Sequence, residues 1–352
     1  MDHQNTSSHS RSASYSPAEG HDDGHDRDYF LNDEGVESRH SGQNLDVSQA
    51  PYSVESERAY NNVSWVYRFP ADQDEVLRQD RQHYVMLISL PGLYRGPVEE
   101  ILNDSSRPRR LLDIGCGTGI WVQEMAEQFP RVDCIGVDIT PLQHDTHLRN
   151  CTYMQVNAPD GLRVFGNESF DVVNMRQMIH ATDDYPALIR AAYRLLRPGG
   201  VLLLHEIQLR FHSAWEGFTV HDSAPGAAQI IEWLDAAHRY RGIDTSLWSR
   251  MEDILIEAGF REDATEVYYH TRQICPAELD TEHGANETLN SAGYMYATRL
   301  MILECGVTDE DGFDETFAMA TEEVRGNSPG RAGPLGAQGV LSPWAYWWAV
   351  KR

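Results

Sequence analysis

The chain has 352 residues, enough for one large domain or two small ones, and its 54 acidic residues against 29 Lys and Arg give a formal net charge of -25. This charge repels nucleic-acid phosphates, so we expect no nucleic-acid partner. The five cysteines form no C-x-x-C pair, which is typical of buried free thiols in a reducing compartment. No apolar run is long enough to cross a bilayer, and the polar N-terminus lacks the apolar core of a secretory signal, so we predict no membrane partner and a cytoplasmic location.

Residues 1–57 differ in composition from the rest of the chain. They are rich in Ser, His, Asp and Gly and poor in aliphatic side chains, so they cannot bury enough apolar surface to fold. Their histidines are irregularly spaced and no cysteines accompany them, which argues against a metal site. We therefore predict a disordered, acidic, Ser- and His-rich tail over 1–57 and a single folded domain over 58–352.

The folded part begins with a helix and then alternates between two kinds of segment. Residues 72–90 have acids in the first turn and are predicted to form a helix that ends at Pro91-Gly92. Beyond it, short apolar segments alternate with amphipathic ones, which is the pattern of an α/β domain with a parallel sheet. Strands are predicted over 110–114, 133–138, 151–156, 170–175 and 201–206.

The segment around the first of these strands is the most informative in the chain. An apolar run containing Asp113 leads into glycines at alternate positions and then into an amphipathic segment, 121–129. The glycines are Gly115, Gly117 and Gly119. This pattern predicts a buried strand, a tight turn and a helix N-terminus, where the backbone can approach a ligand closely and free N–H groups face it.

A second signal supports a nucleoside-containing ligand. The next predicted strand ends in Asp138, 19 residues after Gly119, close to the spacing of ~20 expected for a carboxylate that binds ribose hydroxyls. The two segments together indicate an adenosine-containing cofactor. The glycines follow G-x-G-x-G rather than the G-x-G-x-x-G of dinucleotide-binding proteins, and an acid beside the loop suits the ammonium group of S-adenosylmethionine.

The second half of the chain continues the alternation. Residues 185–196 are predicted to form a helix that ends at the stop signal 197–200, Arg-Pro-Gly-Gly. Further helices are predicted over 227–240, 248–258, 286–306 and 311–325. Strands are predicted over 265–274 and 344–350.

These motifs resemble those of a known family. The run 113–119, D-I-G-C-G-T-G, resembles motif I of class I S-adenosylmethionine-dependent methyltransferases, and 197–200 resembles the stop before their fifth strand. Pro70-Ala71-Asp72 and Trp121 resemble the fungal LaeA-type methyltransferases, as do 137–141, 170–176 and 205–208. The resemblance covers about 57–352. It implies an α/β fold with a Rossmann-like, seven-stranded sheet whose last strand is antiparallel, helical inserts, and S-adenosyl-L-methionine as methyl donor.

The resemblance also implies the cofactor contacts. Asp113 is expected to orient the methionine ammonium through water, while Gly115, Gly117 and Gly119 let the backbone enclose the methionine moiety. Asp138 is expected to accept hydrogen bonds from both ribose hydroxyls. The remaining expected contacts are Ile139 beside it, Asn157 and Ala158 near adenine, and Met175 as an apolar contact, with a place in the core as the alternative for Met175.

His180 is the candidate catalytic residue. It follows the fourth strand at the rim where an acceptor would lie, and an imidazole titrates near neutral pH, so it is suited to act as a general base. A surface or helix-capping role is the alternative. His205-Glu206 is a second candidate pair. Asp183-Asp184 precede a helix and are expected to cap it, so no metal is predicted.

Two hypotheses about function follow. The first is an S-adenosylmethionine-dependent methyltransferase that modifies a small molecule in fungal secondary metabolite biosynthesis. The second is a LaeA-type regulatory protein that acts on metabolite gene clusters through protein partners, with a nuclear location. Several aromatic residues are candidates for the wall of an acceptor pocket, with a place in the ordinary core as the alternative: Trp215, Phe218, Trp233, Tyr294 and Tyr296.

Overall fold

The computed structural model describes residues 52–55, 58–90, 92–141, 143–275, 282–326 and 339–352. All of them belong to one unit, Asp46–Arg352. Of the predicted tail, residues 1–51 and 56–57 lie outside the described residues. Tyr52–Glu55 also fall in the predicted tail, but they form strand β1, which pairs antiparallel with β2 (Arg58–Asn61).

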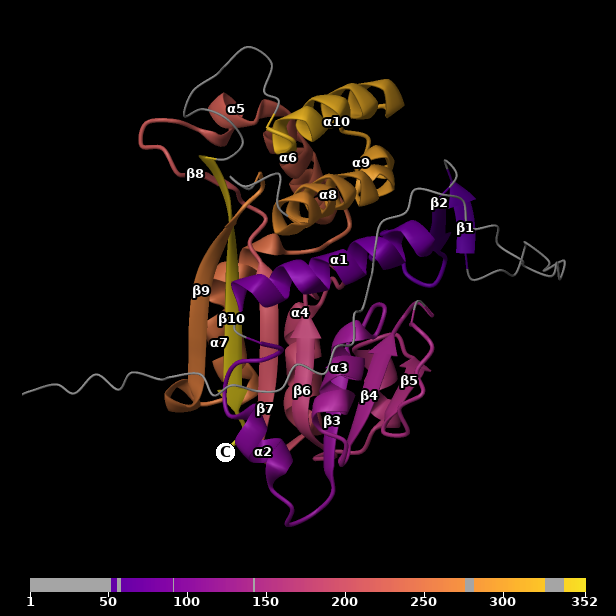
Figure 1. The fold of residues 1–352 in the computed structure, drawn as a ribbon, viewed down its shortest axis with the longest axis vertical. Coiled ribbons are helices and arrows are strands. Elements are labelled where there is room, and N and C mark those ends of the chain that lie inside the picture. Colours follow the sequence, from indigo (N-terminus) through magenta and orange to yellow (C-terminus); the bar gives the residue numbers. More distant parts are fainter. Residues whose placement is uncertain (1–51, 56–57, 91, 142, 276–281, 327–338) are drawn as a thin grey trace, which may run out of the picture. The chain divides into compact units, whose positions relative to one another are not determined.

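A mixed sheet organises this unit (Figure 1). Its strands follow the order β5-β4-β3-β6-β7-β10-β8, and β9 pairs with β10. Strands β3 to β7 are parallel, whereas β10 runs antiparallel between β7 and β9. The bounds are β3 Arg109–Ile114, β4 Val132–Asp138, β5 Cys151–Gln155, β6 Phe170–Arg176, β7 Leu196–Ile207, β8 His212–Ser213, β9 Thr265–Gln273 and β10 Val340–Val350.

This is the predicted Rossmann-like sheet with an antiparallel last strand. It has one strand more than the predicted seven, because the two residues of β8 pair with the start of β10. Strand β7 also begins earlier than predicted. The expected stop signal, residues 197–200, is part of β7. It is hydrogen-bonded to the end of the chain, where the Lys351 N–H donates to the Gly200 carbonyl at 2.9 Å.

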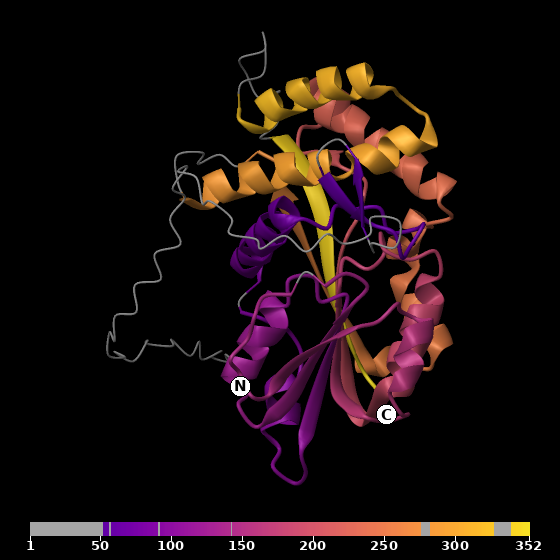
Figure 2. The same ribbon diagram turned by 90° about the vertical axis from the view of Figure 1, so that its right-hand side faces the viewer.

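Both faces of the sheet are covered by helices, which explains the continuous apolar runs in the sequence. Consecutive residues of β3 point to opposite faces: Leu111 packs with α2 and α3, and Leu112 with α4 and α7. Figure 2 shows these two helical layers on either side of the sheet. The helices are α1 Gln73–Ser89, α2 Val98–Asn103, α3 Ile120–Gln128, α4 Tyr185–Leu195, α5 Val220–Ser223, α6 Pro225–Tyr240, α7 Met251–Ala258, α8 Glu282–Ala297, α9 Arg299–Cys305 and α10 Glu310–Val324.

The helical inserts form a separate layer beyond the carboxyl ends of the parallel strands. Helices α6, α8, α9 and α10 share their own apolar core, and α1 lies between that layer and the strand ends (Figure 1). The helix predicted over 286–306 is two helices, because the chain breaks at Thr298. The buried Thr298 hydroxyl donates to the Met295 carbonyl at 2.7 Å and so satisfies a carbonyl at the end of α8. Among the described residues, every helix is too short or too polar to span a lipid bilayer.

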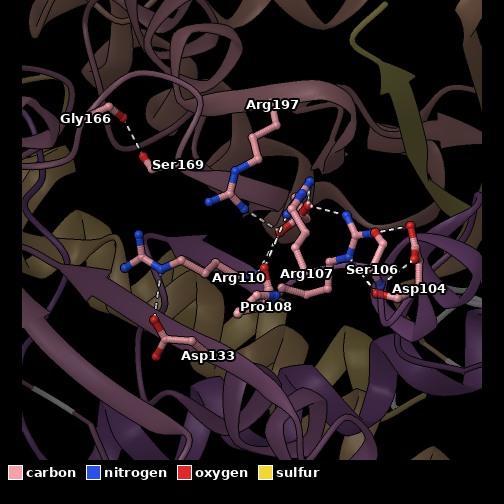
Figure 3. Close-up of polar contacts among 11 residues, drawn as sticks. Asp104, Ser106, Arg107, Pro108, Arg110, Asp133, Gly166, Ser169 and Arg197 are labelled. Carbon is pink, nitrogen blue, oxygen red and sulfur yellow. Dashed lines mark hydrogen bonds and ion pairs between the residues drawn. The ribbon is translucent and has the colours of Figure 1, made fainter.

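A short basic run, residues 107–110 (Arg-Pro-Arg-Arg), leads into β3, and its arginines form ion pairs at the amino ends of the strands (Figure 3). Asp171, only 1% exposed, accepts from the side chains of Arg107, Arg109 and Arg197 at 2.5–3.0 Å. Arg110 pairs with Asp133 at 2.9 Å. Asp104 also pairs with Arg109, so each arginine of the run has a carboxylate partner and none is left unpaired for nucleic acid.

We expect Asp171→Asn to lower the free energy of unfolding by on the order of 3 kcal/mol, since it leaves arginines without their buried partner. Burial raises the pKa of Asp171, but the hydrogen bonds from Arg107 and the Arg110 N–H outweigh it and the pKa is lowered. A lowered folded-state pKa contributes stability that is present above the ordinary carboxyl pKa and is lost as the pH falls through the folded value. Urea unfolding of both proteins from pH 7 down to pH 3 measures this, and a mutant with unchanged acid sensitivity would contradict it.

Candidate functional site

A cavity opens at the carboxyl ends of β3, β4 and β6, where the order of connections in the sheet reverses. It encloses about 1180 Å³, including its open mouth. Open α/β sheets bind ligands at this position because the loops leaving neighbouring strands diverge there. Its walls come from the glycine loop, the ends of β4 and β5, the segment after β6, helix α1 and helix α8.

The glycine loop is held against the end of β4 by backbone hydrogen bonds. The N–H groups of Gly115 and Cys116 donate to the Val137 carbonyl at 2.8 and 3.1 Å. Gly115 and Gly117 have φ angles of +71° and +55°, which only glycine adopts at little cost. A Cβ at Gly115 would lie 2.1 Å from the Met178 sulfur, a cavity-lining group, so both the backbone conformation and the space require glycine.

Asp138 ends β4 and faces the cavity from the far side of this loop. Its Oδ2 accepts from the Gly117 N–H at 2.8 Å, and its Oδ1 accepts from the N–H and hydroxyl of Thr140 at 2.9 and 2.8 Å. Burial raises the pKa of the carboxyl, and these donors oppose the shift. Since Oδ1 already accepts two bonds, only Oδ2 keeps capacity for another without rearrangement.

Asp113 lies behind the loop rather than in the cavity wall. It is 1% exposed; Oδ1 accepts from Asn174, its register neighbour on β6, at 2.7 Å, and Oδ2 has no hydrogen-bond partner among the described residues. Burial raises its pKa to about 6, against the opposing effects of Arg176 and Asn174. A buried carboxylate oxygen without a donor is costly unless a ligand or a water supplies one.

The structure brings together most of the other predicted contacts. Ile139, Asn157 and Ala158 line the cavity. Gly119 does not: it is the N-cap of α3, and a Cβ there would lie 2.5 Å from the Tyr153 hydroxyl. Met175 is fully buried in the core on the α4 side, and the methionine after β6 that lines the cavity is Met178, three residues further on.

Helix α1 covers the cavity, which the sequence motifs did not indicate. Gln79, Gln82, His83 and Met86, one turn apart along one face, all line it. A fifth side chain on this helix, Asp80, accepts from the Thr118 hydroxyl at 2.6 Å and contacts His144 at 2.7 Å. The heptad-like spacing of these polar and apolar groups is the only signal in the sequence that α1 faces a site.

Arg176 is a second group whose role the sequence did not indicate. It ends β6, lines the cavity and contacts the Nδ1 of His83 at 3.1 Å, while its guanidinium lies 5.8 Å from the Trp121 ring centroid. Burial lowers its pKa, and the charge of Asp113 opposes that shift. The cavity wall therefore carries a cation at the end of β6, and the carboxylate of Asp113 lies behind the glycine loop.

His180 lies in the cavity wall, as predicted for an acceptor-side base. It is 4% exposed, its ring centroid lies 5.1 Å from that of His238, and neither ring nitrogen has a hydrogen-bond partner among the described residues. Burial, with a smaller effect of His238, lowers the pKa of His180 well below its usual value. Its imidazole is therefore neutral at pH 7 and can accept a hydrogen bond. The lowered pKa also makes it a weaker base than the near-neutral titration expected from the sequence.

The His205-Glu206 pair does not act as a unit, because consecutive strand residues point to opposite faces. His205 contacts His270 at 3.2 Å away from the cavity. Glu206 accepts from Tyr185 and from the Met178 N–H, both at 2.9 Å, and so anchors the segment that leads to His180. Burial raises the pKa of Glu206 to about 8, against these donors. Asp184 caps α4 by accepting from the Ala187 N–H at 2.9 Å, as predicted.

The residues present fit S-adenosylmethionine. The glycine loop lies so close to cavity-lining side chains that a Cβ at Gly115 would have to displace Met178. Asp138 keeps an accepting oxygen toward the cavity, and Asp113 has an unpartnered buried oxygen close by. A methyltransferase-domain family model matches residues 86–262, half of the chain. The chain belongs to this methyltransferase family. The predicted class I, LaeA-type relationship and the predicted cofactor, S-adenosylmethionine, are thereby confirmed.

Similar proteins are known in fungi. This methyltransferase is 38% identical over 152 residues to the secondary metabolism regulator laeA of Coprinopsis cinerea, which covers 42% of the chain and 37% of that protein. It is 27% identical over 219 residues to the protein-methionine methyltransferase laeA of Emericella nidulans, and this match covers 60% of the chain and 54% of that protein. The chain spans about two fifths of the length of the first curated relatives it matches.

A solved structure is also similar to this methyltransferase. It is phosphoethanolamine N-methyltransferase 2 of Haemonchus contortus in complex with S-adenosylhomocysteine, with a TM-score of 0.44 and 18% identity. The match covers 83% of this chain and 61% of that one.

We expect Gly115→Ala to weaken the binding of S-adenosylhomocysteine at least tenfold, because the new Cβ fills the cavity beside Met178. Gly199→Ala is the matched control: Gly199 has a similar φ of +82°, but a Cβ there meets nothing within 4 Å. Both variants carry the backbone strain of a positive φ, of order 1 kcal/mol. Calorimetric titration should show a loss of affinity in the first variant only; an equal loss in both would mean that strain, not filled space, is responsible.

Proposed function

We propose that this chain catalyses methyl transfer from S-adenosylmethionine to a small-molecule acceptor in fungal secondary metabolism. The observation that supports a small acceptor is the covering of the cavity by α1 and α8. It is lined by Arg78, Gln82 and Met86 from α1 and by Tyr294 from α8. A folded macromolecule would have to displace both helices to reach the interior, whereas a small molecule enters through the existing mouth.

The cofactor contacts follow from the placement of the predicted residues. Asp138 is proposed to bind the ribose through Oδ2, with Ile139, Asn157 and Ala158 around the adenine. Asp113 is proposed to bind the ammonium through water. The backbone at Gly115 and Gly117 would enclose the methionine part, whose carboxylate Arg176 is suited to pair with. Gly119 and Met175 would act indirectly, by packing behind this wall.

The cofactor supplies an electrophilic methyl group bound to a sulfonium. The protein's part is mostly positioning: holding an acceptor at near-attack distance contributes several orders of magnitude to the rate. His180, neutral and with both ring nitrogens unpartnered, is proposed to accept the proton that an oxygen acceptor loses.

A regulatory role is the second candidate, and the names of the fungal relatives favour it. In that case the methyl acceptor is a protein and the chain acts with protein partners. The local pairing of the basic run around Asp171 gives no support to direct contact with nucleic acid.

Metabolite profiling in the organism that encodes the chain separates these functions. A strain carrying Asp113→Ala together with Gly115→Arg should accumulate one series of compounds that lack a single methyl group, because cofactor binding is lost and one tailoring step fails. A general fall of many unrelated metabolites, together with their transcripts, would contradict the small-molecule proposal and favour regulation.

Extract from that strain then serves as the source of acceptor for purified protein. We expect His180→Ala to reduce product formation about a hundredfold with unchanged affinity for S-adenosylhomocysteine, since removal of a general base typically costs this much. His221→Ala is the control, because His221 is about half exposed and pairs with Glu232 on the surface. Full activity of the His180 variant would remove His180 from the mechanism.

A further inference from the structure

A second cavity lies directly beside the cofactor cavity and shares part of its wall. Gln82 of α1, Gln177 after β6 and Tyr294 of α8 line both. The second cavity encloses about 550 Å³ and extends from this shared wall toward β10. We call it the Trp344 chamber, after the indole of Trp344 in its wall. None of the predicted cofactor contacts lines it.

The charged groups lining the Trp344 chamber neutralise each other. They are Arg272 of β9 and Glu287 of α8, 8% and 6% exposed. The Arg272 Nη2 donates to both carboxylate oxygens of Glu287 at 2.5 Å, and Nε donates to Oε1 at 3.0 Å. The guanidinium also lies 5.0 Å from the centroid of the Trp344 ring. A ligand with a net charge would therefore be buried without a counter-charge, which is costly.

Five buried polar atoms in this wall have no hydrogen-bond partner among the described residues. They are Arg272 Nη1, Asn290 Oδ1, Tyr294 Oη, Ser342 Oγ and Trp344 Nε1. Buried polar atoms are almost always paired in folded proteins, so five unpartnered ones on residues that line one cavity indicate a ligand or waters that complete them. Guanidinium and indole nitrogens only donate, and the two hydroxyls can donate, so the missing ligand must mainly accept hydrogen bonds.

The rest of the wall combines apolar side chains with uncharged polar ones. The apolar ones are Ile207, Phe211, Ile274, Met295 and Val324, and the polar ones are Gln82, Gln177, Gln273 and Ser291. Gln177, in the shared wall, has a φ of +56°, a conformation that is uncommon for a residue other than glycine. Its N–H is held by the His205 carbonyl at 2.9 Å, so the surrounding sheet fixes this strained residue between the two cavities. Backbone strain of this kind is concentrated at functional sites.

We propose that the Trp344 chamber holds the body of the methyl acceptor, a neutral, largely apolar or aromatic small molecule with carbonyl or hydroxyl oxygens. Arg272, Trp344 and Ser342 donate hydrogen bonds to those oxygens. The reacting end of the acceptor extends past Gln177 into the cofactor cavity, toward His180. This assignment rests on the proposed small-molecule methyl transfer and names the substrate class for it.

The test uses three small probes of similar size with the full-length protein: ortho-hydroxyacetophenone (neutral), salicylate (an anion) and tyramine (a cation). Saturation-transfer NMR with S-adenosylhomocysteine present should show binding of the neutral probe and weaker or no binding of the charged ones. The neutral probe should bind together with S-adenosylhomocysteine and should not displace it.

Two conservative substitutions locate the probe. Trp344→Phe removes the Nε1 donor but keeps an aromatic ring, and Ser342→Ala removes the hydroxyl. Each should weaken binding of the neutral probe about threefold to tenfold, the usual effect of one hydrogen bond. Trp347→Phe is the matched control, because Trp347 lies on the same strand, is buried and also has an unpartnered Nε1, but packs in the core against Trp248.

The melting temperatures of the same variants separate loss of probe binding from loss of core packing. Ser342→Ala should leave the melting temperature nearly unchanged, since the hydroxyl has no partner to lose. Any of four results would overturn the assignment. Trp344→Phe and Trp347→Phe could have equal effects, or a charged probe could bind better than the neutral one. The neutral probe could displace S-adenosylhomocysteine, or it could fail to bind at millimolar concentration. If S-adenosylhomocysteine itself does not bind, the proposed methyl transfer fails; if it binds and the neutral probe does not, only the chamber assignment fails.

Discussion

The attachment of the glycine loop to the end of β4 is the interaction on which the rest of the site depends. Gly115 and Cys116 donate to the Val137 carbonyl, and Gly117 donates to the side chain of Asp138. These bonds turn the backbone away from the sheet immediately after β3 and set the start of α3. Because they use the last residues of β4, the position of the acidic side chain and the shape of the loop are fixed by the same few atoms.

Helix α1 extends this constraint to the cover of the cavity. Asp80 contacts both the Thr118 hydroxyl in the glycine loop and His144, in the segment after β4. His83 contacts Glu124 of α3 at 2.9 Å and Arg176 at the end of β6. The helix is thus bonded to three of the elements that form the site. These contacts fix the position of α1 relative to the glycine loop and the end of β6.

Much of the fold was predictable because the central strands β3, β4, β6 and β7 are largely buried on both faces and are flanked by strong stop signals. The five parallel strands and the antiparallel final strand follow from apolar runs such as those around Leu111 and Leu202, which need no tertiary information. The break at Thr298 and the pairing of β8 were not predictable, because they depend on a side-chain hydrogen bond and on two residues of β10 far away in the chain.

The site was predictable only where a motif has a fixed local geometry. The loop around Gly115, Gly117 and Asp138 is such a case, since its spacing alone brings the residues together. Met175 and Met178 show the limit of this approach. Met175 lies at the end of β6 and Met178 three residues later, and the chain turns at Gln177 between them, so that Met178 faces the cavity and Met175 does not. The acceptor side has no local motif, because it is assembled from α1, α8, β9 and β10.

The titratable groups on the acceptor side are neutral or mutually neutralised. Burial keeps His180 and His238 uncharged and favours the protonated form of Glu206, while Arg272 and Glu287 neutralise each other. By contrast, the cofactor side contains Asp113, Asp138 and Arg176, suited to the zwitterionic and polar ends of S-adenosylmethionine. In methyl transfer to a neutral acceptor, the positive charge of the sulfonium is spread over the sulfur, the methyl carbon and the acceptor in the transition state, and it leaves with the proton of the acceptor. An acceptor side without a net fixed charge does not oppose this spread, so the division of charge between the two cavities suits the proposed methyl transfer to a neutral acceptor.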